Sequence, residues 1–152
     1  SDSARADLLR RLREDVADGG KADVAFEIGW RSASQGDPQE AIHWYTIAAE
    51  AGHVEAMASL AILLHESGRY ADAIRWYKAA AKTGVRDAMY NLALLHKERG
   101  DTEKSVRWFK KAGRAGDADA MVRVAIGYLK NGELHPAIDW YSDAIEAGIR
   151  DP

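Results

Sequence analysis

The chain has 152 residues, 47% of them apolar, and a formal net charge of −3 at pH 7. This length is sufficient for one core of ordinary size, and the nearly balanced charge gives no whole-chain argument for binding nucleic acid or a membrane. The absence of cysteine excludes disulfides and thiolate metal sites, and there is no run of about 18 apolar residues that would span a bilayer.

The first predicted element is an N-terminal helix within residues 1–20. Four apolar residues in this segment share one helical face: Leu8, Leu9, Leu12 and Val16. Leu12 lies 32 residues before Trp44, the first member of a repeated series described below, so we expect a capping helix that is the second half of a degenerate unit. The start at Ser1, with neither a signal peptide nor an initiator methionine, predicts an excised fragment, and we expect a cytoplasmic location.

From residue 21 onward the sequence repeats with a period of 32 residues, as between positions 44 and 76. The clearest marker is a tryptophan followed by a second aromatic residue, at Trp44-Tyr45, Trp76-Tyr77, Trp108-Phe109 and Trp140-Tyr141. Two glycine series keep the same step, at positions 20, 52, 84, 116 and 148 and at positions 36, 68, 100 and 132. A fixed period of this length indicates an array whose units bury their apolar faces by stacking on one another.

The period predicts four repeats, 21–52, 53–84, 85–116 and 117–148, with 149–152 beginning a further unit. Each repeat contains two short amphipathic helices separated by a glycine turn. In the second repeat the first stripe is Met57, Leu60, Ala61 and Leu64, and the second is Ala73, Ile74, Tyr77 and Ala80. The glycines are expected to end helices, because a left-handed residue closes a helix without strain only when it lacks Cβ.

Helix starts and helix crossings are also marked. Asp37-Pro38 predicts an N-cap followed by proline in the first helical turn, and Asp151-Pro152 predicts another start. Small residues recur in register where the two helices of a unit are expected to cross closely: Gly29, Ala61, Ala93 and Ala125 on first helices, and Ala41, Ala73, Ser105 and Ala137 on second helices.

The repeats resemble the Sel-one-like branch of the tetratricopeptide repeats. The resemblance is carried by Trp76–Ala80 through Gly84 to Ala88–Ala93, and by the same pattern 32 residues later, from Trp108 through Gly116 to Met121. It implies an all-α fold, a right-handed α-solenoid of stacked antiparallel helix pairs with about nine helices and no strands. It further implies a non-enzymatic adaptor that binds a protein or peptide.

In the related repeats, the first helix of each unit lines a concave groove. We call the corresponding residues here the first-helix face: Phe26, Trp30, Ile62, Tyr90, Asn91, Leu94, Val122, Arg123 and Ile126. Two interpretations remain open. Either this face binds an apolar or amphipathic segment, with Trp30 and Tyr90 as anchors, or neighbouring first helices cover one another. Asn91 and Arg123 fit part of a known carboxylate clamp, but the registers of its lysines hold Ala58, Ile62 and Asp119, so the clamp is incomplete.

A basic ridge is predicted on the second helix of the third repeat, at Lys104, Arg107, Lys110, Lys111 and Arg114. It could meet an anion, but no aromatic residue outside the core doublet lies among these cations to stack bases, so we do not expect nucleic acid as a partner. The five histidines show no metal-ligand spacing, and no phosphate loop or cofactor motif is present, so we expect no metal, no cofactor and no enzymatic activity.

Three hypotheses follow. The first is an interaction scaffold, the second is the regulatory array of a larger enzyme or signalling protein, and the third is an anion binder that uses the basic ridge. We also expect Trp140, Tyr141 and Ile145 to form an uncovered end surface, which would allow end-to-end self-association.

Overall fold

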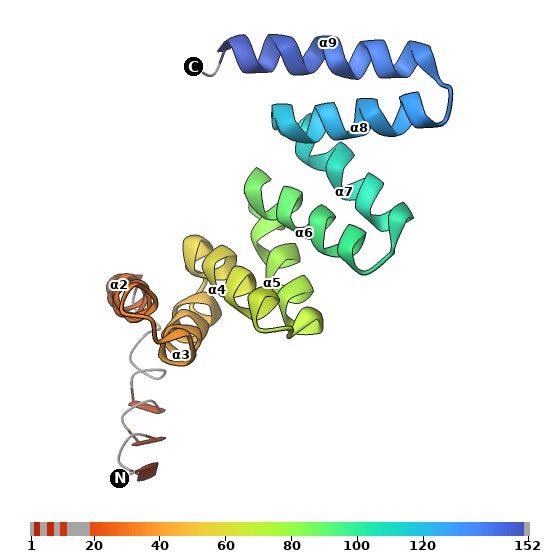
Figure 1. Cartoon of the computed structure of the whole chain (residues 1–152). Coiled ribbons are helices and arrows are strands. Elements are labelled where there is room, and N and C mark those ends of the chain that lie inside the picture. The colour runs from red at the N-terminus through yellow and green to blue at the C-terminus, as the bar shows by residue number, and fades with distance from the viewer. Residues whose placement is uncertain (1, 4–5, 8–9, 12–18, 151–152) are drawn as a thin grey trace. The chain divides into compact units, whose positions relative to one another are not determined.

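The structure is a computed structural model that describes residues 2–3, 6–7, 10–11 and 19–150. From Gly19 to Arg150 it consists of eight α-helices joined by short turns, and no strand occurs in the described ranges (Figure 1). The helices are α2 (Gly19–Ser34), α3 (Pro38–Glu50), α4 (Val54–Glu66), α5 (Tyr70–Lys82), α6 (Arg86–Glu98), α7 (Thr102–Arg114), α8 (Ala118–Lys130) and α9 (Leu134–Arg150). The expected all-α helix-pair fold is therefore confirmed.

The chain divides into two compact units, Ser1–Ala80 and Ala81–Pro152, with the boundary inside α5. In the first unit α3 packs against both α2 and α4. In the second unit each helix from α6 to α9 packs against the next one in the chain. The predicted N-terminal helix, with Leu8, Leu9, Leu12 and Val16, falls largely outside the described residues, as does the predicted start at Asp151-Pro152.

The turns follow the predicted glycine chemistry. Gly52 has φ 90°, its N–H donates to Ala49 C=O at 2.9 Å, and the N–H of His53 donates to Ala48 C=O at 3.0 Å. These two bonds satisfy carbonyls that the end of α3 would otherwise leave exposed. Six more glycines have positive φ between 76° and 101°: Gly36, Gly68, Gly84, Gly100, Gly116 and Gly132.

Aspartate caps begin several of the helices. Asp37 caps α3 by accepting a bond from Glu40 N–H at 3.0 Å, and Pro38 occupies the first helical turn, as predicted. Asp101 and Asp117 cap α7 and α8 in the same way. Each carboxylate satisfies one of the free N–H groups of a helix start, so these boundaries are set locally by the sequence.

Two glycines of the series do not end helices. Gly20 lies in the first turn of α2, and Gly148 lies inside α9, which continues to Arg150. The expected turn at Gly148 is therefore wrong. Glycine within a helix costs about 1 kcal/mol relative to alanine, which is too little to stop a helix that is otherwise favourable. At Gly52 the turn also brings a following helix into contact, whereas at Gly148 no described helix follows.

The predicted close crossing of small residues is present in both units. Gly29 of α2 is buried, and an added Cβ would lie only 2.7 Å from Cδ1 of Tyr45 on α3. In the second unit, buried Ser105 of α7 donates from Oγ to the C=O of Ala93 on α6 at 2.9 Å. Only glycine, alanine or serine leaves enough room for such contacts, so these positions determine how near the paired helices lie.

Candidate interaction surface

In the first unit, the first-helix face exposes two large apolar side chains, Trp30 on α2 and Ile62 on α4. Trp30 is 55% exposed, which is unusual for an indole in a folded protein. Phe26 differs from them because its ring stacks on that of His53, with centroids 4.6 Å apart, and lies 5.6 Å from that of Tyr45. Phe26 therefore helps to hold α2, α3 and α4 together, and Trp30 is the more accessible anchor.

His53 has a structural role that the sequence analysis missed. It caps α4, with its Nδ1 accepting a bond from Ala56 N–H at 3.1 Å. Because Nδ1 is the acceptor, the neutral ring carries its proton on Nε2, which lies 3.2 Å from the carboxylate of Asp23 on α2. The histidine thus connects α2 to the start of α4 beside Phe26, and it is not simply a surface residue.

In the second unit, Arg123 of α8 and Tyr90 of α6 are joined across neighbouring first helices. Arg123 Nε donates to the Tyr90 hydroxyl at 2.8 Å. Its guanidinium carbon lies 5.5 Å from the ring centroids of both Tyr90 and Phe109, and those two rings meet edge to face at 5.5 Å. The sequence analysis paired Arg123 with Asn91 by register alone, and the tie to Tyr90 was not predicted.

The remaining members of the first-helix face fall into two groups. Leu94, Val122 and Asn91 are half-buried, whereas Ile126 is exposed. Leu129, one helical turn beyond Ile126 on α8, is also exposed. Both interpretations of this face thus apply to part of it, since first helices cover some of its apolar side chains and leave others in contact with solvent.

The basic ridge on α7 is largely engaged within its own unit. Lys104 pairs with Asp101 at 3.4 Å and Arg107 with Glu103 at 3.1 Å, in both cases on exposed surface. Lys111 Nζ lies 4.5 Å from the ring centroid of Trp108, and Lys110 Nζ lies 5.0 Å from that of Tyr128 on α8. Carboxylate partners and aromatic faces offset much of this charge, which weakens the case for an anion-binding strip.

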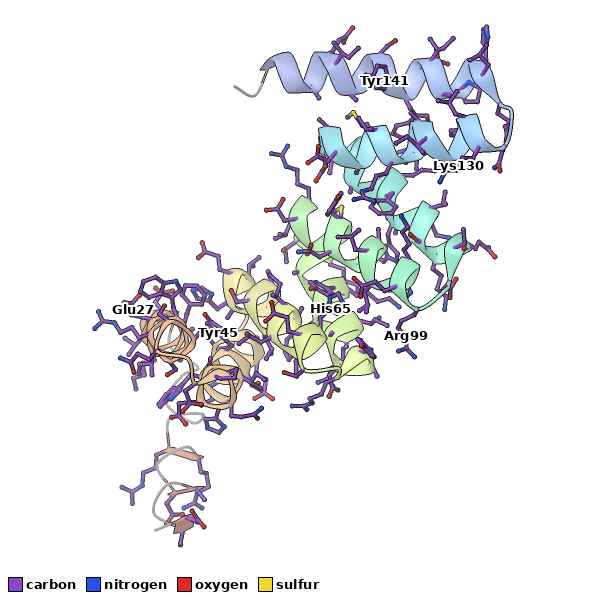
Figure 2. The ribbon with its side chains drawn as sticks, in the orientation of Figure 1. Glu27, Tyr45, His65, Arg99, Lys130 and Tyr141 are labelled. Atoms are coloured by element: carbon purple, nitrogen blue, oxygen red, sulfur yellow. The ribbon has the colours of Figure 1, made fainter. Side chains whose placement is uncertain are left out.

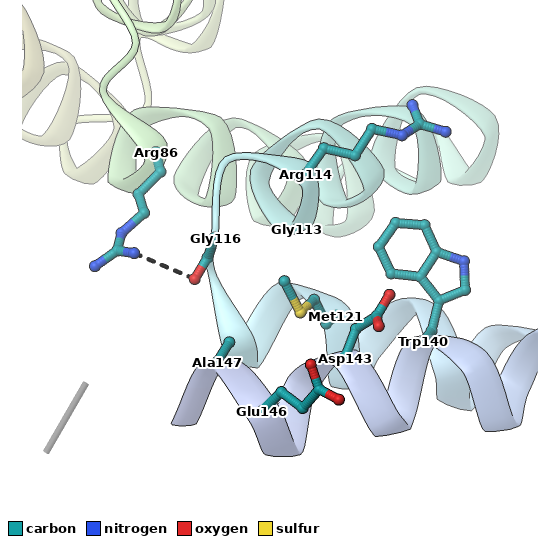
Figure 3. A pocket seen from close by; sticks show the side chains of 9 residues that line it. All are labelled: Arg86, Gly113, Arg114, Gly116, Met121, Trp140, Asp143, Glu146 and Ala147. Carbon is teal, nitrogen blue, oxygen red and sulfur yellow. Dashed lines mark hydrogen bonds between the residues drawn. The ribbon is translucent and has the colours of Figure 1, made fainter. Parts of the chain in front are cut away.

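A first pocket, of about 610 Å³, lies where the starts of α6 and α8 approach the end of α7 and the helix α9 (Figure 3). Arg86 donates to the C=O of Gly116 at 3.2 Å on one side, and Asp143 and Glu146 line the side formed by α9. Trp140 also lines this pocket. A Cβ at Gly113 would lie 2.9 Å from its indole, so glycine is what permits the approach.

Part of the predicted end surface is therefore wrong. Trp140 is half-buried because α7 and α8 cover it, whereas Tyr141 and Ile145, on other sides of α9, are exposed as expected. Val106 and Ile138, which the sequence pattern placed in core stripes, are exposed as well. A helical stripe predicts which side chains share a face, but their burial depends on a neighbouring helix.

A second, narrower hollow of about 340 Å³ lies between α7 and α8. It has an apolar floor and a rim that includes three cationic side chains, with Lys130 at the C-terminal end of α8 (Figure 2). We call it the Gly127 hollow, after the glycine at its centre. Its lining residues are Thr102, Val106, Phe109, Lys110, Arg123, Val124, Gly127, Tyr128, Lys130 and Asn131.

Within the described ranges, no group of three or more histidine, aspartate or glutamate side chains is arranged to hold a metal ion. No helix in the part of the chain that the structure describes has both the length and the apolar character needed to cross a membrane.

Comparison with protein-family models identifies the repeat. A tetratricopeptide repeat model matches residues 26–84, and a Sel1 repeat model matches residues 86–117. The chain is a TPR/Sel1 repeat protein. Proteins of this type generally mediate protein–protein interaction, and the fold is typically a non-catalytic scaffold. No curated protein sequence gives a significant match.

Solved structures share this TPR/Sel1 fold. The protein called c5321, a protective antigen of uropathogenic Escherichia coli with an SLR fold, is 31% identical, with a TM-score of 0.71 over 92% of this chain and 33% of its own. The Sel1 repeat protein from Oxalobacter formigenes is 26% identical, with a TM-score of 0.66 over 84% of this chain and 58% of its own. MamA, at 20% identity, has a TM-score of 0.68 and is covered over 87% of its length, which shows likeness of fold alone.

Proposed function

We propose that this TPR/Sel1 repeat protein is an interaction module that binds a peptide or a partner helix along its first-helix face. The observation that carries the proposal is the exposure of Trp30, an indole more than half accessible on a helix whose other aromatic residue, Phe26, is packed. Exposed tryptophan and arginine side chains are the residue types that most often dominate binding energy at protein interfaces.

The second unit supports the same proposal. Arg123 is held by Tyr90 and lies near two aromatic rings, so less side-chain entropy is lost when it meets a partner. Ile126 is exposed and lies on the same helix. A polar anchor fixed beside apolar side chains is suited to an amphipathic helix or an extended peptide, which presents both kinds of group.

The test is selection from a displayed library of random peptides, followed by affinity measurements on purified chains. We expect the selected peptides to bind Trp30→Ala or Arg123→Ala at least about tenfold more weakly, a loss of about 1.4 kcal/mol. The matched control is Ile138→Ala, which removes an equally exposed apolar side chain from α9, outside the first-helix face. If both test variants keep their helical circular dichroism and bind as the wild type does, the first-helix face is not the site.

Self-association is a second candidate, supported by exposed Tyr141 and Ile145 on α9. A surface of this kind can pair with a different surface of another copy. The cytoplasmic location and the role as regulatory part of a larger enzyme remain predictions.

A further inference from the structure

The Gly127 hollow exists because one side chain of the repeat is missing. At the register of Gly127 the two preceding repeats have leucine, Leu63 on α4 and Leu95 on α6. Leu95 is completely buried, so this position normally supplies a side chain to the interior. At Gly127 an added Cβ would meet no atom within 4 Å, which shows that α7 has not moved closer to close the space.

The consequence of the missing leucine is visible on α7. Val106 is 39% exposed, whereas Ile42, at the same register on α3 and followed by a helix that carries Leu63, is only 8% exposed. The floor of the hollow is therefore apolar surface that an aliphatic side chain covers elsewhere in the protein. Phe109 and Tyr128 complete this floor. Its size and chemistry suit one aliphatic side chain, and covering it is favourable because apolar surface leaves water.

The rim restricts the chemistry of the partner. Lys110, Arg123 and Lys130 line the hollow, and none of its ten lining residues carries a carboxylate. Lys110 is held over the ring of Tyr128, and Arg123 is bonded to Tyr90, so both cations have defined positions. An apolar cavity bordered by three cations favours an aliphatic group that is flanked by negative charge.

We infer that the Gly127 hollow is a docking site for a partner segment that inserts a leucine-sized aliphatic side chain between acidic residues. The inserted side chain takes the place of the leucine that the repeat lacks, and the flanking carboxylates meet Lys110, Arg123 and Lys130. This inference rests on the proposed function, since both make the chain a binder of protein segments, but it concerns a different group of residues.

The test is a titration followed by nuclear magnetic resonance of the backbone amides. The probe is a pentapeptide with capped ends and a leucine between two pairs of aspartates, since a dissociation constant on the order of 1 mM is sufficient for this method. We expect saturable shifts centred on Val106, Gly127 and Tyr128, and weaker binding as the ionic strength rises. A peptide with alanine in place of leucine, or with lysines in place of the aspartates, should bind at least about tenfold more weakly.

The decisive variant is Gly127→Leu, which restores the missing side chain and fills the hollow. We expect it to weaken pentapeptide binding at least about tenfold and to unfold at a temperature no lower than the wild type, because the added leucine replaces a helical glycine where space is open. The matched control is Gly148→Leu on α9, where an added Cβ also meets nothing within 4 Å, and it should leave binding unchanged.

Three outcomes overturn the inference: Gly127→Leu binds the pentapeptide as the wild type does, the lysine peptide binds equally well, or the shifts are centred elsewhere. A change in the sedimentation of the chain alone on making Gly127→Leu would also overturn it, because the occupant would then be a second copy. Loss of the hollow with retained Trp30-dependent binding of selected peptides rejects only this inference. The converse result rejects only the proposed first-helix face.

Discussion

The contact between Gly29 and Tyr45 allows a direct test of how closely paired helices approach. In Gly29→Ala the new Cβ would lie 2.7 Å from Cδ1 and 2.8 Å from Cε1 of Tyr45, a ring that is only 3% exposed and has little room to move. We expect this overpacking to destabilise the protein by about 1–3 kcal/mol. Replacing glycine by alanine within a helix returns about 1 kcal/mol, so the net change should be about 0–2 kcal/mol of destabilisation.

Gly127→Ala is the matched control, because it makes the same replacement inside a helix where the new Cβ meets nothing within 4 Å. It should stabilise the protein by up to about 1 kcal/mol. The helix-propensity gain is common to both variants, so the difference between them, about 1–3 kcal/mol, measures the overpacking at Tyr45.

The assay is urea unfolding followed by circular dichroism, with the midpoint and the slope compared for each variant. A shorter side chain at position 45 should relieve the clash, so the penalty of Gly29→Ala should shrink when it is measured in a Tyr45→Leu background. Equal changes in midpoint for Gly29→Ala and Gly127→Ala would refute the argument, because the close approach of α2 and α3 would then have no energetic consequence.

Three further predictions concern single side chains. Burial raises the pKa of Tyr45, so the unfolded chain ionises first, and stability should fall as pH rises above the ordinary tyrosine pKa of about 10; alkaline unfolding of Tyr45→Phe should show a smaller loss than the wild type. The N–H of Lys104 lowers the pKa of Asp101, so its stabilising effect should be present above the ordinary aspartate range and disappear as pH falls through the lowered value. Acid unfolding of Asp101→Asn, which keeps a cap without the charge, should lack that step. If self-association uses the exposed side of α9, Tyr141→Glu should remove concentration-dependent sedimentation, and unchanged sedimentation would exclude that surface.

The sequence predicted the helices and most of their boundaries, because these depend on local properties. The left-handed conformation at Gly52 and the carboxylate of Asp37 each act within a few residues of the chain. The 32-residue period adds that the same local pattern recurs, and this is sufficient to identify the class of fold. Gly148 shows the limit, since a glycine at the right register does not end a helix on its own.

The surface was predicted less completely. Register identified Trp30 and Arg123 as candidates, but it could not show that Tyr90 bonds Arg123 or that His53 caps α4. The Gly127 hollow was missed, although a sequence signal exists, namely the glycine in a series that otherwise has leucine. These features depend on which side chains from different helices come within a few ångströms of one another. Local residue preferences fix the helices, whereas the gaps and contacts between helices are decided only when the helices pack.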